Sequence, residues 1–497
     1  MTRSVFFALL AATLTFRFWL AHAMPITGDE AYFIWWGRIP DWGFYDHPPM
    51  VGWWLAALLR VSDAAWWLRL PALLLPGVLS LAVARALRGN SLAWGAATLV
   101  LLAPADVWNV FITTDTPLIY FSFFSALAFL RAAKSDDARF YLLSGVLLSG
   151  AVLSKYFAVL LGVAYLLHAL YSPSRKKWLG LLLCYAAVVP AVLLMAWWNW
   201  GHCWSNIMFN VYNRNADAGW SWKNPLLYGV MLLYLLTPPV IWQLVKCRSE
   251  LAMRWREAGP RALILIAVSP LVLFAALSLM KQIGLHWPLS FLPFCFMLVA
   301  YLVEAGAMRR LVRFFAGFAA LHVLVIGVTS QLPLELWQKS RLYDGIVLTF
   351  EAQTLIDSLK PFERDYVFAS DGYSNAVTLG YQARRYFLVF GEASSHARHD
   401  DILTDFRALD GRNILVLRKT APSPGEYARY FRAVETREVQ VRGVNFTIVL
   451  GRGFDYTRYR DSVLASVRAK YYRIPSWLPQ QGCYFCERYF PGETCQR

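Results

Sequence analysis

The sequence predicts a helical membrane protein that ends in a smaller soluble α/β domain. Hydrophobic residues make up 58% of the 497 residues and charged residues only 16%, whereas soluble domains carry about 25% charged residues. Long stretches almost free of charge recur as far as Ser330, and beyond it the composition is that of an ordinary globular protein. These features exclude a disordered chain and an ordinary cytosolic enzyme. They predict that the residues up to Ser330 lie in a lipid bilayer.

The net charge of +16 does not indicate a nucleic-acid-binding protein. Residues 1–330 hold 25 Lys and Arg against 13 Asp and Glu, whereas residues 331–497 hold 23 against 19. Most of the positive excess therefore lies in short loops between apolar stretches, which is typical of membrane orientation. We expect no nucleic-acid partner.

About eleven apolar stretches are expected to cross the bilayer as helices, because roughly 20 apolar residues span a hydrocarbon core of about 30 Å. The first stretch is interpreted as a span rather than a cleaved signal peptide, since Arg17 interrupts it and no small-residue cleavage site precedes a soluble domain. The predicted spans cover residues 4–23, 69–87, 90–108, 115–130, 140–155, 156–173, 178–197, 225–245, 262–280, 287–305 and 314–330.

The positive charges predict how these spans are oriented. If the N-terminus is cytoplasmic, the cytoplasmic loops carry 17 Lys and Arg and the opposite loops carry six. Cytoplasmic loops are enriched in Lys and Arg, so this bias favours the orientation chosen. It places the loop of residues 24–67 and the whole region after Ser330 on the outer side. The six outer residues are Arg38, Arg60, Lys155, Arg214, Lys223 and Lys281.

Residues 331–497 are predicted to form a small α/β domain on the outer face. Short β-rich runs at 365–370, 385–390, 413–417 and 445–450 alternate with helical patterns at 348–359 and 399–409. Three cysteines, Cys483, Cys486 and Cys495, crowd near the end of this domain. A disulfide is expected there rather than a zinc site, because no fourth ligand is evident, and the pairing is left open. The other four cysteines lie in or next to apolar spans and are interpreted as small buried hydrophobes, namely Cys184, Cys203, Cys247 and Cys295.

The loop of residues 24–67 carries the first candidate chemistry. Its seven Trp fit interfacial anchors, but anchoring does not explain the adjacent Asp29 and Glu30 directly after a span. Ionisable groups at such depth are costly and usually functional. A carboxylate here can remove the proton of an acceptor hydroxyl.

Further charged side chains occupy similar positions. Asp115 begins one uncharged stretch of 15 residues, which ends before Arg131, and Lys155 ends another, which begins after Arg139. Each stretch covers only about 22 Å as a helix. Both charges are therefore expected to be recessed below the outer surface; snorkelling is the alternative, and it suits Lys155 better than Asp115. Lys281 and His286 lie between two later apolar runs on the same side and could stabilise a phosphate leaving group.

Together these motifs resemble bacterial glycosyltransferases related to the protein O-mannosyltransferases. Asp29-Glu30-Ala31-Tyr32 and Tyr45-Asp46-His47-Pro48-Pro49 are similar to the first outer loop of that family. Its later motifs resemble Thr114-Asp115-Thr116-Pro117-Leu118, Leu153-Ser154-Lys155-Tyr156, and Lys281 with His286-Trp287-Pro288. The resemblance covers residues 1–330 and implies a membrane domain of the GT-C fold in a bacterial inner membrane. His47-Pro48-Pro49 differs from the pattern of the lipid A aminoarabinose transferases, which disfavours that substrate.

The resemblance also implies the reaction and the site residues. The donor would be a polyprenyl-phosphate-linked sugar, and the sugar would pass with inversion to an envelope acceptor, which could be lipid A or its core, a glycan or a protein. Asp29 is the candidate general base; no cofactor is implied, and a divalent metal is left open. The candidate catalytic residues are Asp29, Glu30 and Asp115; the candidate donor-phosphate ligands are Lys155, Lys281, His286 and His47; the candidate sugar or acceptor contacts are Tyr32, Tyr45, Asp46 and Trp287.

Two other functions fit parts of the pattern. A polytopic transporter or flippase would suit eleven spans with buried charges, but transporters commonly show internal repeats and midplane charges, whereas here no repeat is found and the charges gather at one face. An enzyme similar to O-antigen ligases is the nearer alternative, and the Asp29-Glu30 pair argues against it. Residues 206–222 are rich in Asn and aromatic side chains suited to binding a sugar, and no role is assigned to them.

Overall fold

The computed structural model describes residues 1–215, 218–392, 398–493 and 495. The chain forms two compact units, each assembled from segments that are far apart in the sequence. Unit 1 comprises Met1–Met24, Leu58–Leu194 and Asp217–Gln331, and unit 2 comprises Pro25–Ala57, Met195–Ala216 and Leu332–Arg497. The loop that follows the first helix thus belongs to the same unit as the C-terminal region.

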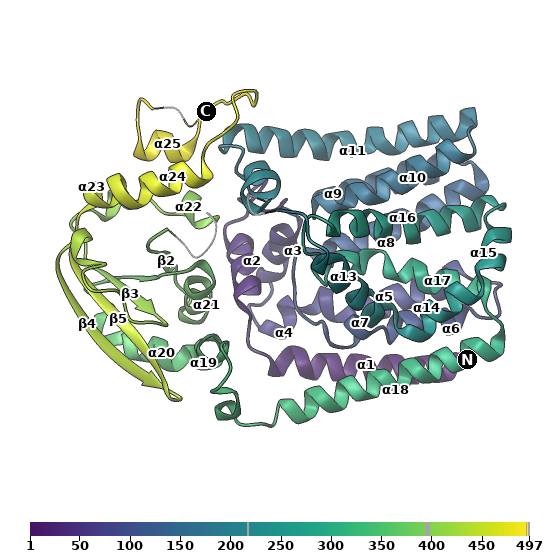
Figure 1. Cartoon of the computed structure of the whole chain (residues 1–497), viewed down its shortest axis with the longest axis horizontal. Coiled ribbons are helices and arrows are strands. Elements are labelled where there is room, and N and C mark those ends of the chain that lie inside the picture. The colour runs from purple at the N-terminus through teal and green to yellow at the C-terminus, as the bar shows by residue number, and fades with distance from the viewer. Residues whose placement is uncertain (216–217, 393–397, 494, 496–497) are drawn as a thin grey trace. The chain divides into compact units, whose positions relative to one another are not determined.

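The part of the chain up to Gln331 is helical wherever the structure describes regular elements (Figure 1). Apolar side chains of α5, α6, α8, α10, α16 and α17 form one continuous core in unit 1. The longer elements are α1 (Arg3–Ala23), α2 (Gly28–Arg38), α3 (Met50–Leu59), α5 (Leu70–Ala86), α6 (Ala93–Leu101), α7 (Pro104–Trp108), α8 (Asp115–Ser135), α9 (Ala138–Val152), α10 (Val159–Tyr171), α11 (Arg175–Gly201), α13 (Lys223–Leu236), α14 (Pro238–Lys246), α15 (Arg248–Arg254), α16 (Ala258–Ser278), α17 (Leu292–Leu302) and α18 (Ala305–Thr329). Shorter elements are α4 (Ala65–Leu68), η1 (Tyr156–Ala158), α12 (Ser205–Ile207), η2 (Met208–Tyr212), η3 (Asn213–Asn215) and η4 (Trp287–Ser290).

The predicted spans are all helical, but they differ in length. Among the described residues, five helices are long and apolar enough to cross a membrane, namely α1, α8, α11, α16 and α18, and the pair α13 and α14, bent by 93°, makes a sixth if it is one span. The predicted span 90–108 is divided into α6 and α7, with Pro104 as the first residue of α7. The chain is therefore a helical membrane protein. Among the described residues, four of the other predicted spans coincide with shorter apolar helices, at Leu70–Ala86, Ala138–Val152, Tyr156–Tyr171 and Leu292–Leu302.

Arg17, which interrupts the first predicted span, is fully buried in unit 1. Its guanidinium donates hydrogen bonds to the carbonyl oxygens of Leu73 at 3.0 Å, Ala72 at 2.6 Å and Asn109 at 2.9 Å. A charge inside a transmembrane bundle persists when backbone carbonyls or other polar groups satisfy it. These contacts explain how a spanning helix accommodates an arginine.

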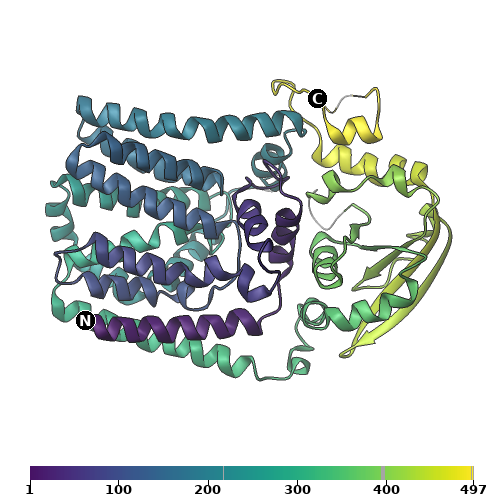
Figure 2. The same ribbon diagram turned by 180° about the vertical axis from the view of Figure 1, so that it is seen from behind.

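Unit 2 contains a five-stranded sheet with the strand order β2-β1-β3-β5-β4. β1 pairs in parallel with β2 and β3, while β5 pairs antiparallel with β3 and β4. The β4–β5 hairpin, visible in Figure 2, turns through Arg442 and Gly443 with φ of 48° and 76°, as two-residue hairpin loops of positive φ do. The strands are β1 (Val367–Ser370), β2 (Leu388–Val389), β3 (Ile414–Arg418), β4 (Phe431–Val441) and β5 (Val444–Phe454).

Alternating side chains of this sheet enter two separate cores. Leu415 and Leu417 of β3 pack with α19, α20 and α21 on one face, whereas Ile414 and Val416 pack with the C-terminal helices on the other. This alternation is what the two-residue period of a strand produces. The helices are α19 (Tyr343–Phe350), α20 (Ala352–Leu359), α21 (Tyr373–Ala383), α22 (Asp400–Leu403), α23 (Tyr456–Tyr459), α24 (Ala465–Tyr471) and α25 (Tyr484–Tyr489), with short turns η5 (Leu334–Trp337), η6 (Lys360–Phe362), η7 (Phe406–Leu409), η8 (Ala428–Tyr430) and η9 (Arg460–Leu464).

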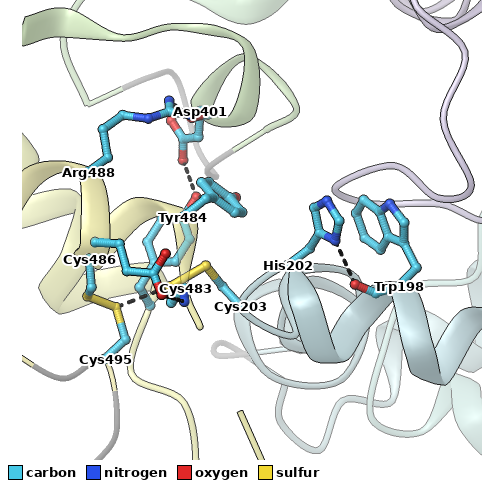
Figure 3. The surroundings of a disulfide bond; sticks show 11 residues. Trp198, His202, Cys203, Asp401, Cys483, Tyr484, Cys486, Arg488 and Cys495 are labelled. Atoms are coloured by element: carbon cyan, nitrogen blue, oxygen red, sulfur yellow. Dashed lines mark hydrogen bonds between the residues drawn. A yellow bond between two sulfur atoms is a disulfide. The ribbon is translucent and has the colours of Figure 1, made fainter. Parts of the chain in front are cut away.

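Two disulfides hold segments of unit 2 together (Figure 3). Cys486 pairs with Cys495, and Cys483 pairs with Cys203, 280 residues away in the sequence. The interpretation of Cys203 as a buried hydrophobe is therefore wrong, because the fold brings it from the end of α11 to the C-terminal segment. Cys184, Cys247 and Cys295 are free.

We expect alkylation under non-reducing, denaturing conditions to modify three cysteines and to leave Cys203, Cys483, Cys486 and Cys495 protected. A non-reduced digest should contain a peptide that links Cys203 to Cys483. Cys203→Ser should lower the free energy of unfolding by about 2–5 kcal/mol, the usual effect of removing a native disulfide, whereas Cys184→Ser should leave the disulfides intact. Four or more modified cysteines before reduction would contradict this pairing.

Candidate functional site

The N-terminus of α2 separates the roles of Asp29 and Glu30. Thr27-Gly28-Asp29-Glu30 forms a capping box, in which the N–H of Glu30 donates to Thr27 Oγ1 at 3.4 Å and Glu30 Oε2 accepts the N–H of Thr27 at 3.1 Å. This reciprocal pair satisfies two of the helix's free N–H groups. Glu30 is completely buried, so its carboxylate fixes the start of α2.

Asp29 is exposed at the same helix end. The hydroxyl of Tyr373, at the start of α21, donates to Asp29 Oδ1 at 3.4 Å. Burial, opposed by Arg398, raises the pKa of Tyr373 to about 12, so its hydroxyl remains a donor. Gly28 allows α2 to approach α21, because a Cβ at this position would collide with Ser374 Oγ. Asp29 thus offers an accessible carboxylate on a fixed backbone.

Asp46 is the centre of a buried network in unit 2. It is 1% exposed, and its Oδ2 lies 2.7 Å from Arg398 Nη1 and 3.5 Å from His47 Nδ1. Tyr32 donates its hydroxyl to Asp46 Oδ1 at 3.2 Å. Burial opposes ionisation of Asp46, but His47 and Arg398 outweigh it and hold the pKa of Asp46 well below its usual range. The carboxylate is therefore a permanent anion that neutralises Arg398.

Arg398 connects this network to Asp29. Its guanidinium carbon lies 4.3 Å from the ring centroid of Tyr373, the residue that donates to Asp29. Tyr32 contacts the edge of the same ring, with centroids 5.6 Å apart. Asp29, Tyr373, Arg398, Asp46 and Tyr32 therefore form one continuous cluster.

The asparagine-rich segment supports the backbone of this cluster. Asn206 Nδ2 donates to the carbonyl of Phe44 at 2.9 Å, and Asn210 Nδ2 donates to the carbonyl of Asp46 at 2.9 Å. These amides therefore position residues 44–46. Residues 216 and 217 of the predicted 206–222 segment lie outside the described residues.

His399 is buried beside Tyr45 and stays neutral. The N–H of Tyr45 donates to His399 Nδ1 at 3.4 Å, and the N–H of His399 donates to the hydroxyl of Tyr32 at 2.9 Å. Burial lowers the pKa of His399 to about 4, whereas an unfolded histidine has a pKa near about 6.5. Burial acts in the opposite direction on the next two carboxyls and raises the pKa of Asp400 and Asp401.

We expect His399 to reduce the stability of unit 2 as the pH falls from about 6.5 to about 4, because only the unfolded chain takes up its proton in that range. The loss can reach about 3 kcal/mol at the acidic end. His399→Asn keeps an acceptor and removes the titration. The Tm of wild type minus that of His399→Asn should therefore decrease on acidification. Because Asp400 and Asp401 are present in both proteins, the effect of their titration on Tm cancels in this difference. A difference that stays constant with pH would contradict this assignment.

Unit 1 holds a second group of predicted site residues. Lys155 Nζ lies 2.9 Å and 3.0 Å from the two carboxylate oxygens of Asp115, and the two residues are 7% and 6% exposed. His286 Nε2 lies 3.9 Å from Asp115 Oδ2, and the His286 side chain is 45% exposed. The structure thus brings Lys155 and His286 to one buried carboxylate.

Aromatic rings fix the geometry of this second group. The ring of Phe157 lies 4.3 Å from that of Trp287 and 5.5 Å from Lys155 Nζ. Trp287 is 3% exposed, so it packs beneath His286 rather than projecting from the surface. Lys281 is half-buried in the connection that leads from α16 to η4. The second group can therefore present an exposed imidazole and a buried ammonium to an anion.

Sequence reasoning missed Tyr373, Arg398 and His399. Their partners Asp29, Asp46 and Tyr45 are more than 340 residues away in the sequence, so no local motif joins them. The one available signal was the charged run Arg398-His399-Asp400-Asp401, of which only the last three residues were included in a predicted helical pattern. That pattern, 399–409, forms only the short α22 and η7.

Candidate metal ligands gather at one place within the described ranges. There the Sγ atoms of Cys483, Cys486 and Cys495 all lie within 4.8 Å of one another. Disulfides occupy all three. Within the described residues, Asp29 and Asp115 belong to no such group.

The family described as dolichyl-phosphate-mannose-protein mannosyltransferase matches residues 46–200. Over 181 residues the chain is 26% identical to the lipid A galacturonosyltransferase RgtD of Rhizobium johnstonii, a match that covers 35% of this chain and 38% of RgtD. The matched part therefore spans well under two thirds of that relative's length.

Two solved structures of ArnT from Cupriavidus metallidurans resemble the chain over most of its length. The apo structure has a TM-score of 0.61 at 14% identity, covering 89% of this chain and 97% of ArnT. The structure bound to undecaprenyl phosphate has a TM-score of 0.60 at 13% identity, covering 90% and 98%. At such identities the likeness shows the fold alone.

These findings confirm the predicted resemblance. The chain has the GT-C fold of ArnT and is related in sequence to membrane glycosyltransferases, one of which modifies lipid A.

Proposed function

We propose that the chain is an integral-membrane glycosyltransferase that moves a sugar from a polyprenyl-phosphate-linked donor to an envelope acceptor, with inversion at the anomeric carbon. The observation that carries the proposal is the match of the mannosyltransferase family to residues 46–200, the range that contains Asp46, His47, Asp115 and Lys155. The similarity to a lipid A galacturonosyltransferase supports lipid A or its core as the acceptor class. The undecaprenyl phosphate bound by ArnT supports a polyprenyl phosphate as the donor lipid.

The proposed reaction assigns one role to each charged group. The acceptor oxygen attacks the anomeric carbon while its proton passes to the carboxylate of Asp29. The bond between that carbon and the phosphate oxygen breaks, and polyprenyl phosphate leaves with the bonding electrons. Lys155, Lys281, His286 and His47 are assigned to the phosphate, because cations there stabilise the charge that grows as the bond breaks.

The remaining candidates act through position. Glu30 keeps α2 and hence Asp29 in place, and Asp115 orients Lys155 through their ion pair. Asp46 holds Arg398, and Tyr32 donates a hydrogen bond that orients Asp46. Tyr45 and Trp287 are buried, so they are assigned to packing behind the sugar or acceptor site rather than to direct contact with the ligand.

A transporter and a transferase differ in what purified protein does to the donor. In detergent, a transferase converts a lipid-linked sugar plus acceptor into glycoside and free polyprenyl phosphate, whereas a transporter leaves the donor chemically unchanged. We expect polyprenyl phosphate to be released only when acceptor is present. Intact donor after prolonged incubation with lipid A, core and protein acceptors would refute the proposal.

We further propose that the chain resides in a bacterial inner membrane as a protein of about eleven spans, with residues 1–330 forming the membrane domain and residues 331–497 a periplasmic domain. The 17-to-6 distribution of Lys and Arg supports this orientation. The disulfides of unit 2 also support it, since such bonds persist in oxidising compartments.

A reporter enzyme that folds only outside the cytoplasm should be active when fused after Ser330 and inactive when fused after Asp137, in the connection between α8 and α9. The two positions lie on opposite sides in the proposed orientation. A cytoplasmic reporter should give the reverse result. Activity of the cytoplasmic reporter after Ser330 would overturn the orientation.

A further inference from the structure

A cavity of about 470 Å³ lies within unit 1 where several helices end. Arg85 in the last turn of α5, Arg131 and Lys134 near the end of α8, and the first turn of α16 line it. Asp115 is the first residue of α8, and this 21-residue helix is roughly 30 Å long. The cavity is therefore at the opposite end of the helices from the Asp115–Lys155 pair and is separate from the proposed transfer site.

The charge lining this cavity is entirely positive. No carboxylate lines it, and within the described ranges Arg85, Arg131 and Lys134 form no ion pair of 4 Å or less. By contrast, Arg139 in the first turn of α9, which follows α8 in the chain, is paired with Asp137 at 2.8 Å. Three cations beside one hollow repel one another, and a bound anion would remove that repulsion.

Backbone groups add to this preference for an anion. α16 begins at Ala258, and its N-cap residue Glu257 makes no side-chain cap hydrogen bond. Gly259 and Pro260 of its first turn line the cavity. The N-terminus of a helix carries partial positive charge and unsatisfied N–H groups, which favour phosphate groups.

The rest of the lining is mostly apolar, with Tyr301 contributing a phenol. Leu127, Leu130, Leu263 and Met297 contribute to the walls, and they suit acyl carbons better than a hydrated free ion. The volume is in the range of sites that hold small organic ligands, about 300–1,000 Å³. We propose that this cavity binds the phosphate headgroup of an anionic membrane lipid, with its first acyl carbons against the apolar wall. Basic pockets between transmembrane helices on the cytoplasmic side are suited to such headgroups, and the inference does not depend on the proposed transferase activity.

The test uses the full-length protein, delipidated in neutral detergent and titrated with phosphatidylglycerol, phosphatidylcholine or inorganic phosphate while bound lipid is counted by native mass spectrometry. Phosphatidylglycerol should bind at least about tenfold more tightly than phosphatidylcholine, and the triple variant Arg85→Ala/Arg131→Ala/Lys134→Ala should lose at least about tenfold in affinity for it. Arg88→Ala removes an exposed cation just beyond α5 that does not line the cavity, and it should bind like wild type.

Several outcomes would overturn the inference. Equal binding of the two lipids, or unchanged binding by the triple variant, would show that the cavity does not select an anionic headgroup. Displacement of phosphatidylglycerol by inorganic phosphate at similar concentrations would identify a free-ion site instead. If the triple variant does not fold, Arg131→Gln alone should still weaken binding of phosphatidylglycerol severalfold, and wild-type affinity in that variant would refute the inference.

Discussion

We expect Asp29→Asn to lower the rate of sugar transfer by at least about 10²-fold, the lower range of what general-base assistance contributes. Asparagine keeps the size of the side chain and can still accept from Tyr373, but it cannot take up a proton at neutral pH. Because Asp29 is exposed and Glu30 caps α2, the variant should still insert and fold. The measurement is the initial rate with a lipid-linked sugar donor.

The controls for this variant separate chemistry from folding. Asp357→Asn changes an exposed carboxylate on α20 that pairs with Lys360 at 2.8 Å, and it should transfer sugar like wild type. Glu30→Gln should instead lower the Tm, because it weakens the capping box. If Asp29→Asn turns over near the wild-type rate, Asp29 is not the base and the proposed mechanism is wrong.

Lys155→Met should both destabilise and inactivate the protein. The change leaves Asp115 buried without its ammonium partner, and breaking a buried ion pair costs about 3–5 kcal/mol. Removing a group that stabilises developing charge costs about 10²–10³-fold in kcat. Tm and the rate of transfer should therefore fall together in this variant.

The double variant Lys155→Met/Asp115→Asn distinguishes the two effects. It replaces the charged pair by uncharged side chains of similar volume, so most of the lost stability should return, whereas the rate should remain low because the phosphate has lost its cation. Asp115→Asn with Lys155 intact provides the matched single variant. Wild-type activity in the double variant would show that the pair is structural only.

Local patterns in the sequence predicted part of this arrangement. The uncharged stretches next to Asp115 and Lys155 were too short to span the bilayer, and the structure buries both residues and joins them directly. The strands β1, β2, β3 and β5 were expected from their runs of β-branched and aromatic residues. Each strand and each uncharged stretch is a run of consecutive residues, whereas the contact between Asp115 and Lys155 joins positions 40 residues apart and was not predicted.

Features that depend on distant segments could not be predicted. Arg398 contacts Asp46, which is 352 residues away in the sequence, and Cys203 is bonded to Cys483, which is 280 residues away. The residue pattern of one segment does not indicate which distant segment it contacts. β4 was missed for a different reason. As the edge strand of the sheet it is largely exposed, so its sequence, FRAVETREVQV, is polar and charged and lacks a hydrophobic run.

Glu30 belongs both to the predicted pair of site carboxylates and to a helix-capping motif. The adjacent Asp29 and Glu30 were interpreted as a pair of site carboxylates, whereas the same four residues also spell a capping box. In the structure Glu30 caps the N-terminus of α2, whereas Asp29 is accessible to solvent. In a capping box, the carboxylate at the third helical position therefore has a structural role even when the residue before it is a candidate base.

The anomeric configuration of the product tests the central claim most directly. Purified protein is incubated with a polyprenyl-phosphate-linked sugar of defined configuration and an envelope acceptor, and the glycoside is examined by NMR while polyprenyl phosphate is quantified. The account predicts a product of inverted configuration, one polyprenyl phosphate for each glycoside formed, and formation of both at least about 10²-fold more slowly with Asp29→Asn. A glycoside of retained configuration, or an unchanged donor, would contradict it.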